Sequence, residues 1–210
     1  NRWSWRFRPT TGEAATGAWV EGDNLRARLV AGGGHAPYPG LLEIELDRGW
    51  KTYWTNPGDS GHPPRLDWSA SQNVSTVEHR YPAPRRFAYQ DFRHLGYKDR
   101  LPLSLAVEPE NPSAPVELRL GVEILVCNDI CVPERLSLSL ELPADGATEP
   151  AERRLFARAG ERLPVSPAKA GAEIVGPWIT GDRLALEIRS STWERPDLFI
   201  ARSEEHTSEL

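Results

Sequence analysis

Apolar and polar residues alternate along short runs through most of the first 142 residues. The runs 25–29 (LRARL), 42–46 (LEIEL) and 101–107 (LPLSLAV) each place apolar side chains at every second position. Successive side chains of a strand point to opposite faces of a sheet, so this period of two predicts half-buried β-strands. No segment of this region has a convincing period of 3.6 residues. The sequence therefore predicts an all-β domain.

The clearest pattern lies between positions 115 and 142. Apolar residues occupy the even positions of 116–126 and again those of 136–142. A three-residue loop at 128–130 joins the two runs into a hairpin, in which Val122 pairs with Leu136. A slip of one residue would pair apolar with polar positions throughout, so the pattern itself selects this register.

One predicted pair fits this register badly. Ile124 comes to lie opposite Glu134, and Pro133 stands beside it. Proline cannot donate a ladder hydrogen bond. We therefore expect the ladder to loosen at this point.

The chain has two cysteines, Cys127 and Cys131, separated by three residues. On a single strand their Cα atoms would lie about 13 Å apart, beyond bonding reach. On a helix they would share a face, but Pro133 and the even-numbered apolar stripe oppose a helix. In the hairpin register they face each other directly, at a Cα separation of about 4.5–5.5 Å that suits a disulfide. The sequence thus predicts a Cys127–Cys131 disulfide across the turn.

Such a disulfide closes a small loop and stabilises the fold by only on the order of 2 kcal/mol. Both cysteines are expected on the polar sides of their strands, where an incoming thiolate can reach them. An exposed, locally closed disulfide is the exchangeable type. Two other interpretations stay open. One is an inert hairpin clip, and the other is a Cu(I) site, because soft thiolates suit that ion.

A set of short motifs, in this order along the chain, resembles the N-terminal periplasmic domain of the DsbD thiol–disulfide interchange proteins, and most closely its ScsB-like branch. The resemblance covers residues 18–142. The motifs are WKTYW (50–54), NPGDSG (56–61), PP (63–64), YPAP (81–84), LGY (95–97) and VCNDICVP (126–133).

The resemblance implies an immunoglobulin-like β-sandwich in the periplasm, as a soluble domain of a larger inner-membrane protein. It also implies the electron route. Reducing equivalents would arrive from membrane-embedded and thioredoxin-like domains of the same full-length chain. They would leave to a thioredoxin-fold partner such as a periplasmic disulfide isomerase. No cofactor, metal or nucleic acid is expected.

Residue roles carry over by position. Cys131 matches the family's second cysteine, which forms the mixed disulfide with partners, and Cys127 matches the first, which resolves it. An aromatic cap loop shields the disulfide in the family, and here it corresponds to 87–97. Its candidate shielding residues are Phe87, Tyr89, Phe92 and Tyr97. The best-known DsbD domains have a wider cysteine spacing, so cap geometry and partner choice do not carry over directly.

Other conspicuous residues are assigned structural roles. The aromatic residues Trp50, Tyr53, Trp54 and Trp68 are expected in the sandwich core rather than on a ligand surface. Residues 56–61 are expected to form a turn, with Gly supplying positive φ. The string at 58–61 also resembles the nucleophile segment of chymotrypsin-like proteases, but Ser60 has no histidine in that family's surrounding pattern.

Charge and composition fit this picture. A formal charge of −5 and a pI near 5.6 argue against a nucleic-acid or anionic-membrane binder. A hydrophobic fraction of 39% supplies enough apolar material for a packed core. No stretch approaches the roughly 18 apolar residues that span a bilayer.

The predicted organisation has five parts. Residues 1–17 are a leader remnant, expected to be poorly ordered, and 18–144 form the interchange domain. Residues 145–170 form a linker with one short helix inside 149–163, and 171–201 begin a second β domain, with strands at 182–189 and 193–200. Residues 202–210 (RSEEHTSEL) resemble the translation of a widely used sequencing adapter, with a genuine polar tail as the alternative.

Overall fold

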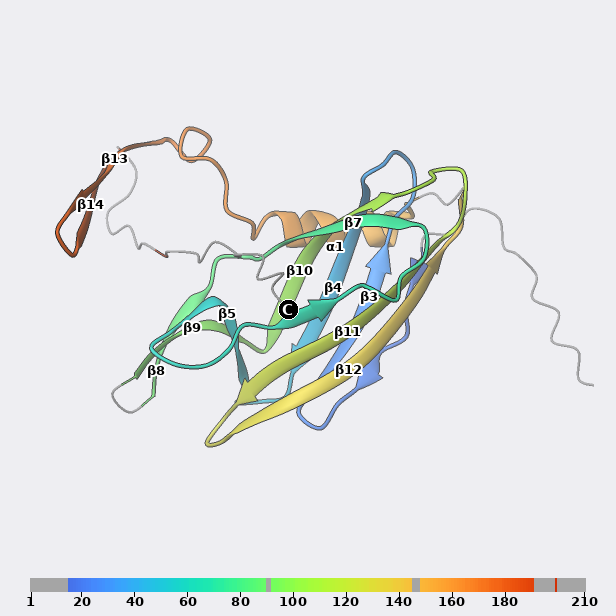
Figure 1. Ribbon diagram of the computed structural model, residues 1–210, viewed down its shortest axis with the longest axis horizontal. Coiled ribbons are helices and arrows are strands. Elements are labelled where there is room, and N and C mark those ends of the chain that lie inside the picture. Colours follow the sequence, from blue (N-terminus) through green and yellow to red (C-terminus); the bar gives the residue numbers. More distant parts are fainter. Residues whose placement is uncertain (1–14, 90–91, 145–147, 191–198, 200–210) are drawn as a thin grey trace, which may run out of the picture.

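Two facing β-sheets make up most of the computed structural model, which describes residues 15–89, 92–144, 148–190 and 199 (Figure 1). The first sheet contains, in spatial order, β1 (Ala15–Thr16), β3 (Leu25–Ala31), β4 (Tyr38–Leu46), β10 (Arg100–Pro109) and β7 (Val74–Arg80), with β2 (Val20–Glu21) beside β3. The second contains β12 (Cys131–Leu142), β11 (Val116–Cys127), β5 (Lys51–Gly58), β9 (Phe92–Lys98) and β8 (Arg85–Tyr89), with β6 (Arg65–Asp67) beside β11. The all-β domain predicted from the alternating runs is confirmed, and so is the β-sandwich that the family resemblance implies.

The core lies between the two sheets, where β11 and β12 cross β3 and β4 (Figure 1). Burial alternates along β12 with the period of two that the sequence showed. The largest fully buried side chains include Leu29, Leu42, Ile44, Leu101, Leu103, Leu118, Leu120, Ile124 and Leu142. The apolar positions of the runs therefore form one continuous core, as period-two strands require.

The register of the β11–β12 hairpin is the predicted one along its whole length, from Val116 opposite Leu142 to Cys127 opposite Cys131. The ladder is continuous at Pro133, so the expected loosening there is wrong. Because β12 is the edge strand of its sheet, the missing N–H of Pro133 leaves no neighbouring strand unpaired.

Glu134 fits opposite Ile124 because its buried carboxylate has partners outside the hairpin. Its Oε1 accepts a hydrogen bond from Asn24 Nδ2 at 2.8 Å, and its Oε2 accepts one from the backbone N of Asp23 at 3.3 Å. The pair that looked misfitting in the sequence therefore anchors β12 to the β2–β3 turn.

The helix expected inside 149–163 is α1 (Pro150–Gly160), and it packs on the outer face of the first sheet. Val30 and Leu41 of that face are buried against the helix residues Leu155, Phe156 and Ala159. Thr16 Oγ1 also donates a hydrogen bond to Glu152 Oε1 at 2.9 Å. Two segments outside the predicted boundaries 18–144 therefore contact the sandwich. The strand β1 pairs with β3, and the apolar side of α1 packs on the first sheet.

Two further strands, β13 (Ala172–Thr180) and β14 (Arg183–Ser190), pair as a separate two-stranded sheet (Figure 1). The strand expected at 182–189 is therefore present. The strand expected at 193–200 and the segment 202–210 fall outside the described residues, apart from Phe199, and so do residues 1–14. Among the described residues, no helix has the length and apolar character that a bilayer-spanning segment needs.

Candidate functional site

The two cysteines are bonded at the turn end of the β11–β12 hairpin. Their sulfur atoms lie 2.06 Å apart and their Cα atoms 4.0 Å apart. The turn between them is closed by a hydrogen bond from the backbone N of Asn128 to the O of Ile130, at 2.9 Å. The cross-strand opposition predicted from the apolar stripes is therefore present, and it produces the predicted disulfide.

The two cysteines differ sharply in exposure. Cys127 is 2% exposed, whereas Cys131 is an exposed residue. The expectation that both would be accessible on polar strand faces is wrong for Cys127, because β5 pairs with β11 at that point and places Lys51 opposite Cys127. Cys131 stays open because, in the part of the chain that the structure describes, β12 is the edge strand of its sheet. An attacking thiolate therefore reaches Cys131 more readily.

Tyr53 covers the disulfide from β5. Its hydroxyl lies 3.2 Å from Cys127 Sγ and 3.7 Å from Cys131 Sγ. Disulfide sulfurs carry no proton, so the hydroxyl is the donor in both contacts. Tyr53 is 4% exposed, and this burial raises the pKa of its hydroxyl above the ordinary value. The group therefore keeps its proton at neutral pH.

Tyr53 is buried, but its predicted place in the core between the sheets is wrong, because it lies against the disulfide on the other face of β5. Trp54, the next residue, lies in the core between the sheets as predicted. Side chains alternate along a strand, so the position of Trp54 already implies that Tyr53 points to the outer face of its sheet. That alternation was the signal in the sequence that could have identified Tyr53.

The short turn at 59–61, which follows β5, holds the tyrosine ring in place. The turn expected at 56–61 is wrong for residues 56–58, which belong to β5. Gly61 has φ +107°, and a Cβ atom there would lie 2.4 Å from Tyr53 Cε1, so the backbone packs directly on the ring. On β9, the His94 ring meets Tyr53 edge-on at 5.6 Å between centroids, and His94 Nδ1 lies 3.2 Å from the O of Ser60. Ser60 thus belongs to the cover of the disulfide site.

The candidate cap residues lie on the β8–β9 hairpin, next to β5. Phe87 is half-buried, and the ammonium of Lys98 lies 5.1 Å from its ring centroid. Phe92 is 47% exposed, with its ring 6.3 Å from that of His94. Tyr97 instead belongs to the core between the sheets, where its hydroxyl donates to the O of Pro82 at 2.8 Å.

The side chain of Tyr89 lies outside the described residues. Shielding of the disulfide by Phe87 and Phe92 stays a prediction.

Comparison with known proteins adds independent findings. A family model described as "Thiol:disulfide interchange protein DsbD, N-terminal" matches residues 35–143. The crystal structure of the N-terminal periplasmic domain of ScsB from Proteus mirabilis is similar, with a TM-score of 0.72 and 21% identity. The match covers 91% of this chain and 76% of that one, and at this identity it shows the shared fold. No curated protein matches.

The family match spans more than half of the chain and includes both bonded cysteines. The sandwich that carries them has the fold of the ScsB domain. This chain belongs to the DsbD N-terminal family.

Proposed function

We propose that this domain is a periplasmic carrier of reducing equivalents, which exchanges its Cys127–Cys131 disulfide with the thiols of a thioredoxin-fold partner. The reducing equivalents would come from membrane-bound domains of its own full-length chain. The observation that carries the proposal is the asymmetry of the site, in which an exposed cysteine is bonded to a buried cysteine beside a hydroxyl donor. Family membership supports the same chemistry.

Reduction of the domain takes two exchange steps. A thiolate of the donor attacks Cys131 Sγ, so a bond forms between the donor sulfur and Cys131 while the Cys127–Cys131 bond breaks. The electron pair of the broken bond leaves on Cys127 Sγ. The donor's second thiolate then attacks the donor's first sulfur, which is bonded to Cys131 in the mixed disulfide, and Cys131 is released as a thiolate. This domain then holds two thiols, and the donor holds a disulfide.

Delivery to an oxidised partner runs in the opposite sense. Cys131 attacks the partner's disulfide and forms the mixed disulfide, and Cys127 then attacks Cys131 Sγ to release the reduced partner. Cys127 has only to reach a sulfur already beside it, so its burial does not hinder this step. The Tyr53 hydroxyl is placed to donate a hydrogen bond to Cys127 whenever that sulfur carries negative charge.

Trapping of mixed disulfides tests these roles. Reduced Cys127→Ser and Cys131→Ser variants are mixed with an oxidised thioredoxin, and the products are separated without reductant and identified by mass. We expect Cys127→Ser to accumulate the mixed disulfide and Cys131→Ser to form none. Equal trapping by the two variants would contradict the assignment.

An inert structural disulfide is the rival function, and the burial of Cys127 is the observation in its favour. Structural disulfides have reduction potentials below about −300 mV, whereas exchangeable ones lie higher. Equilibration of the intact chain with dithiol buffers of known potential, followed by thiol alkylation and mass measurement, distinguishes the two. A value far below that limit would overturn the carrier proposal.

A further inference from the structure

A row of directly paired residues crosses four neighbouring strands of the second sheet. Cys131 on β12 pairs with Cys127 on β11, Cys127 pairs with Lys51 on β5, and Lys51 pairs with Lys98 on β9. Directly opposed residues point to the same face, with Cβ atoms about 4.5–5.5 Å apart. Both lysines therefore extend the line of the disulfide on the outer face of the sheet.

Lysine is rare in this chain, which makes its position at the disulfide notable. Only three of the 25 basic residues are lysines. Lys51 and Lys98 stand side by side in the row, and the third, Lys169, is exposed in the segment before β13. A lysine ammonium is a compact point charge, whereas an arginine guanidinium spreads its charge over a plane.

Two lysines and the carboxylate of Asp129 act on one another electrostatically at this place. Burial and the neighbouring Lys98 lower the pKa of Lys51, while Asp129 of the turn opposes that change. The ammonium of Lys98 lies over the Phe87 ring, whose face attracts cations. Arg85 pairs with Gly96 on the same face and adds another cation. An anion arriving here would relieve the repulsion between the lysines.

We infer that Lys51 and Lys98 form an anion-attracting flank of the disulfide, and that the partner of this domain carries carboxylates next to its reactive cysteine. The inference rests on the proposed exchange function. Two strand spacings of about 4.8 Å separate Cys131 from Lys51. Attack at Cys131 therefore brings the residues beside the partner's cysteine to about 10 Å from Lys51, with Lys98 one strand further away, and at such separations charges still interact at ordinary salt. Carboxylates at those positions favour the encounter, and lysines at those positions oppose it.

The test uses two blocked pentapeptides with a central cysteine, flanked in one by glutamates and in the other by lysines. At low ionic strength, the thiolate of each peptide attacks Cys131 of the intact chain, so a peptide–Cys131 mixed disulfide forms and Cys127 is released as a thiolate. Alkylation traps the released Cys127, and mass measurement of the adduct gives the rate. Rates are divided by the thiolate fraction of each peptide, because the flanking charges also change the peptide's thiol pKa. We expect the wild-type chain to prefer the glutamate peptide by about tenfold.

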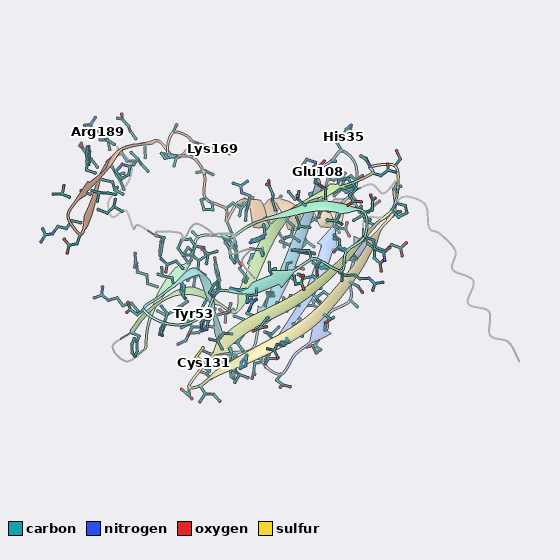
Figure 2. The ribbon with its side chains drawn as sticks, viewed as in Figure 1. His35, Tyr53, Glu108, Cys131, Lys169 and Arg189 are labelled. Carbon is teal, nitrogen blue, oxygen red and sulfur yellow. A yellow bond between two sulfur atoms is a disulfide. The ribbon has the colours of Figure 1, made fainter. Side chains whose placement is uncertain are left out.

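Three variants isolate the lysine pair. The Lys51→Gln/Lys98→Gln double variant should lose most of the preference. Lys98→Gln alone alters an exposed side chain and should lose part of it without disturbing the fold. Lys169→Gln is the matched control, because this lysine lies far from Cys131 (Figure 2), and it should keep the full preference. Roughly 1 M salt, with a Debye length near 3 Å, should abolish the preference in all chains.

The outcomes separate the inference from the function on which it rests. Equal thiolate-corrected rates for the two peptides in the wild-type chain would overturn the inference and leave thiol exchange intact. An unchanged preference in both Lys98→Gln and the double variant would overturn it as well. Failure of both peptides and of a neutral dithiol to reduce the chain would instead overturn the proposed function.

Discussion

The Tyr53 hydroxyl donates a hydrogen bond to the disulfide, and this contact is expected to influence how readily the disulfide is reduced. A hydrogen bond to a charged group contributes about 1.5–3 kcal/mol. Tyr53→Phe removes the donor and keeps the ring, so Cys127 should become a poorer leaving group. We expect the rate at which a neutral dithiol reduces the disulfide to fall at least about tenfold. Stopped reactions analysed by alkylation and mass measure that rate.

The pH dependence of the effect follows from the direction of the tyrosine's pKa shift. Burial raises the pKa of Tyr53 above its ordinary value near 10, so the hydroxyl stays protonated below that pH. The ratio of wild-type to Tyr53→Phe rates should therefore be constant from about pH 6 to pH 9. Tyr38→Phe is the matched control, because Tyr38 is equally buried and its hydroxyl donates to the O of Pro112. An unchanged rate in Tyr53→Phe would exclude a role for this hydrogen bond.

For single residues, the sequence predicts which residues pair across the hairpin, but it does not predict which residues cover the disulfide. The opposition of Cys127 and Cys131 is predictable, because the leucines and valines of the hairpin determine the register. The cover over Cys127 is not, because it comes from Tyr53 on a different strand and from the irregular turn that follows β5 at 59–61. A turn of this kind has no period, so a hydrophobic pattern cannot specify its path.

Among the elements, the β11–β12 hairpin shows how a local misfit can be compensated from elsewhere. The strand pattern places the polar residue Glu134 opposite the apolar residue Ile124. The structure supplies hydrogen bonds to its carboxylate from Asp23 and Asn24, which precede β3. Such partners are distant in sequence and belong to a loop, so the strand pattern contains no information about them.

Glu134→Ala should therefore destabilise the sandwich rather than improve the apolar pairing. The substitution leaves the Asn24 amide and the Asp23 N–H without their acceptor, at a cost of about 1–3 kcal/mol in the free energy of unfolding. Urea unfolding followed by tryptophan fluorescence measures the loss. Glu141→Ala, at an exposed position of the same strand, is the control and should change stability by less than about 0.5 kcal/mol. A higher free energy of unfolding in Glu134→Ala would contradict this prediction, because it would show that the buried carboxylate destabilises the fold.

On the scale of the whole molecule, the alternating runs predict the strands, but they do not predict that a helix covers one of the two sheets. The apolar side of the segment 149–163 indicates a helix with something to bury, yet composition assigns the segment to a linker. In the structure this side covers Val30 and Leu41, whose strands also contribute to the core through their other face. The first sheet is therefore buried on both faces near α1, which lies past the predicted boundary at 144, and we expect the stable unit to include this helix.

Two shortened chains test whether α1 is part of that stable unit. One ends at residue 165 and keeps the helix, and the other ends at residue 144 and lacks it. Both lack Phe199, whose ring contacts Trp54, so the difference between them reports the helix together with the flanking contacts of Thr148 and Arg162. Exposure of Val30 and Leu41 and loss of the hydrogen bond from Thr16 to Glu152 should lower the free energy of unfolding by about 2–4 kcal/mol in the shorter chain. Urea unfolding of the two chains measures the difference, and equal stabilities would mean that α1 rests on the sheet without contributing to the fold.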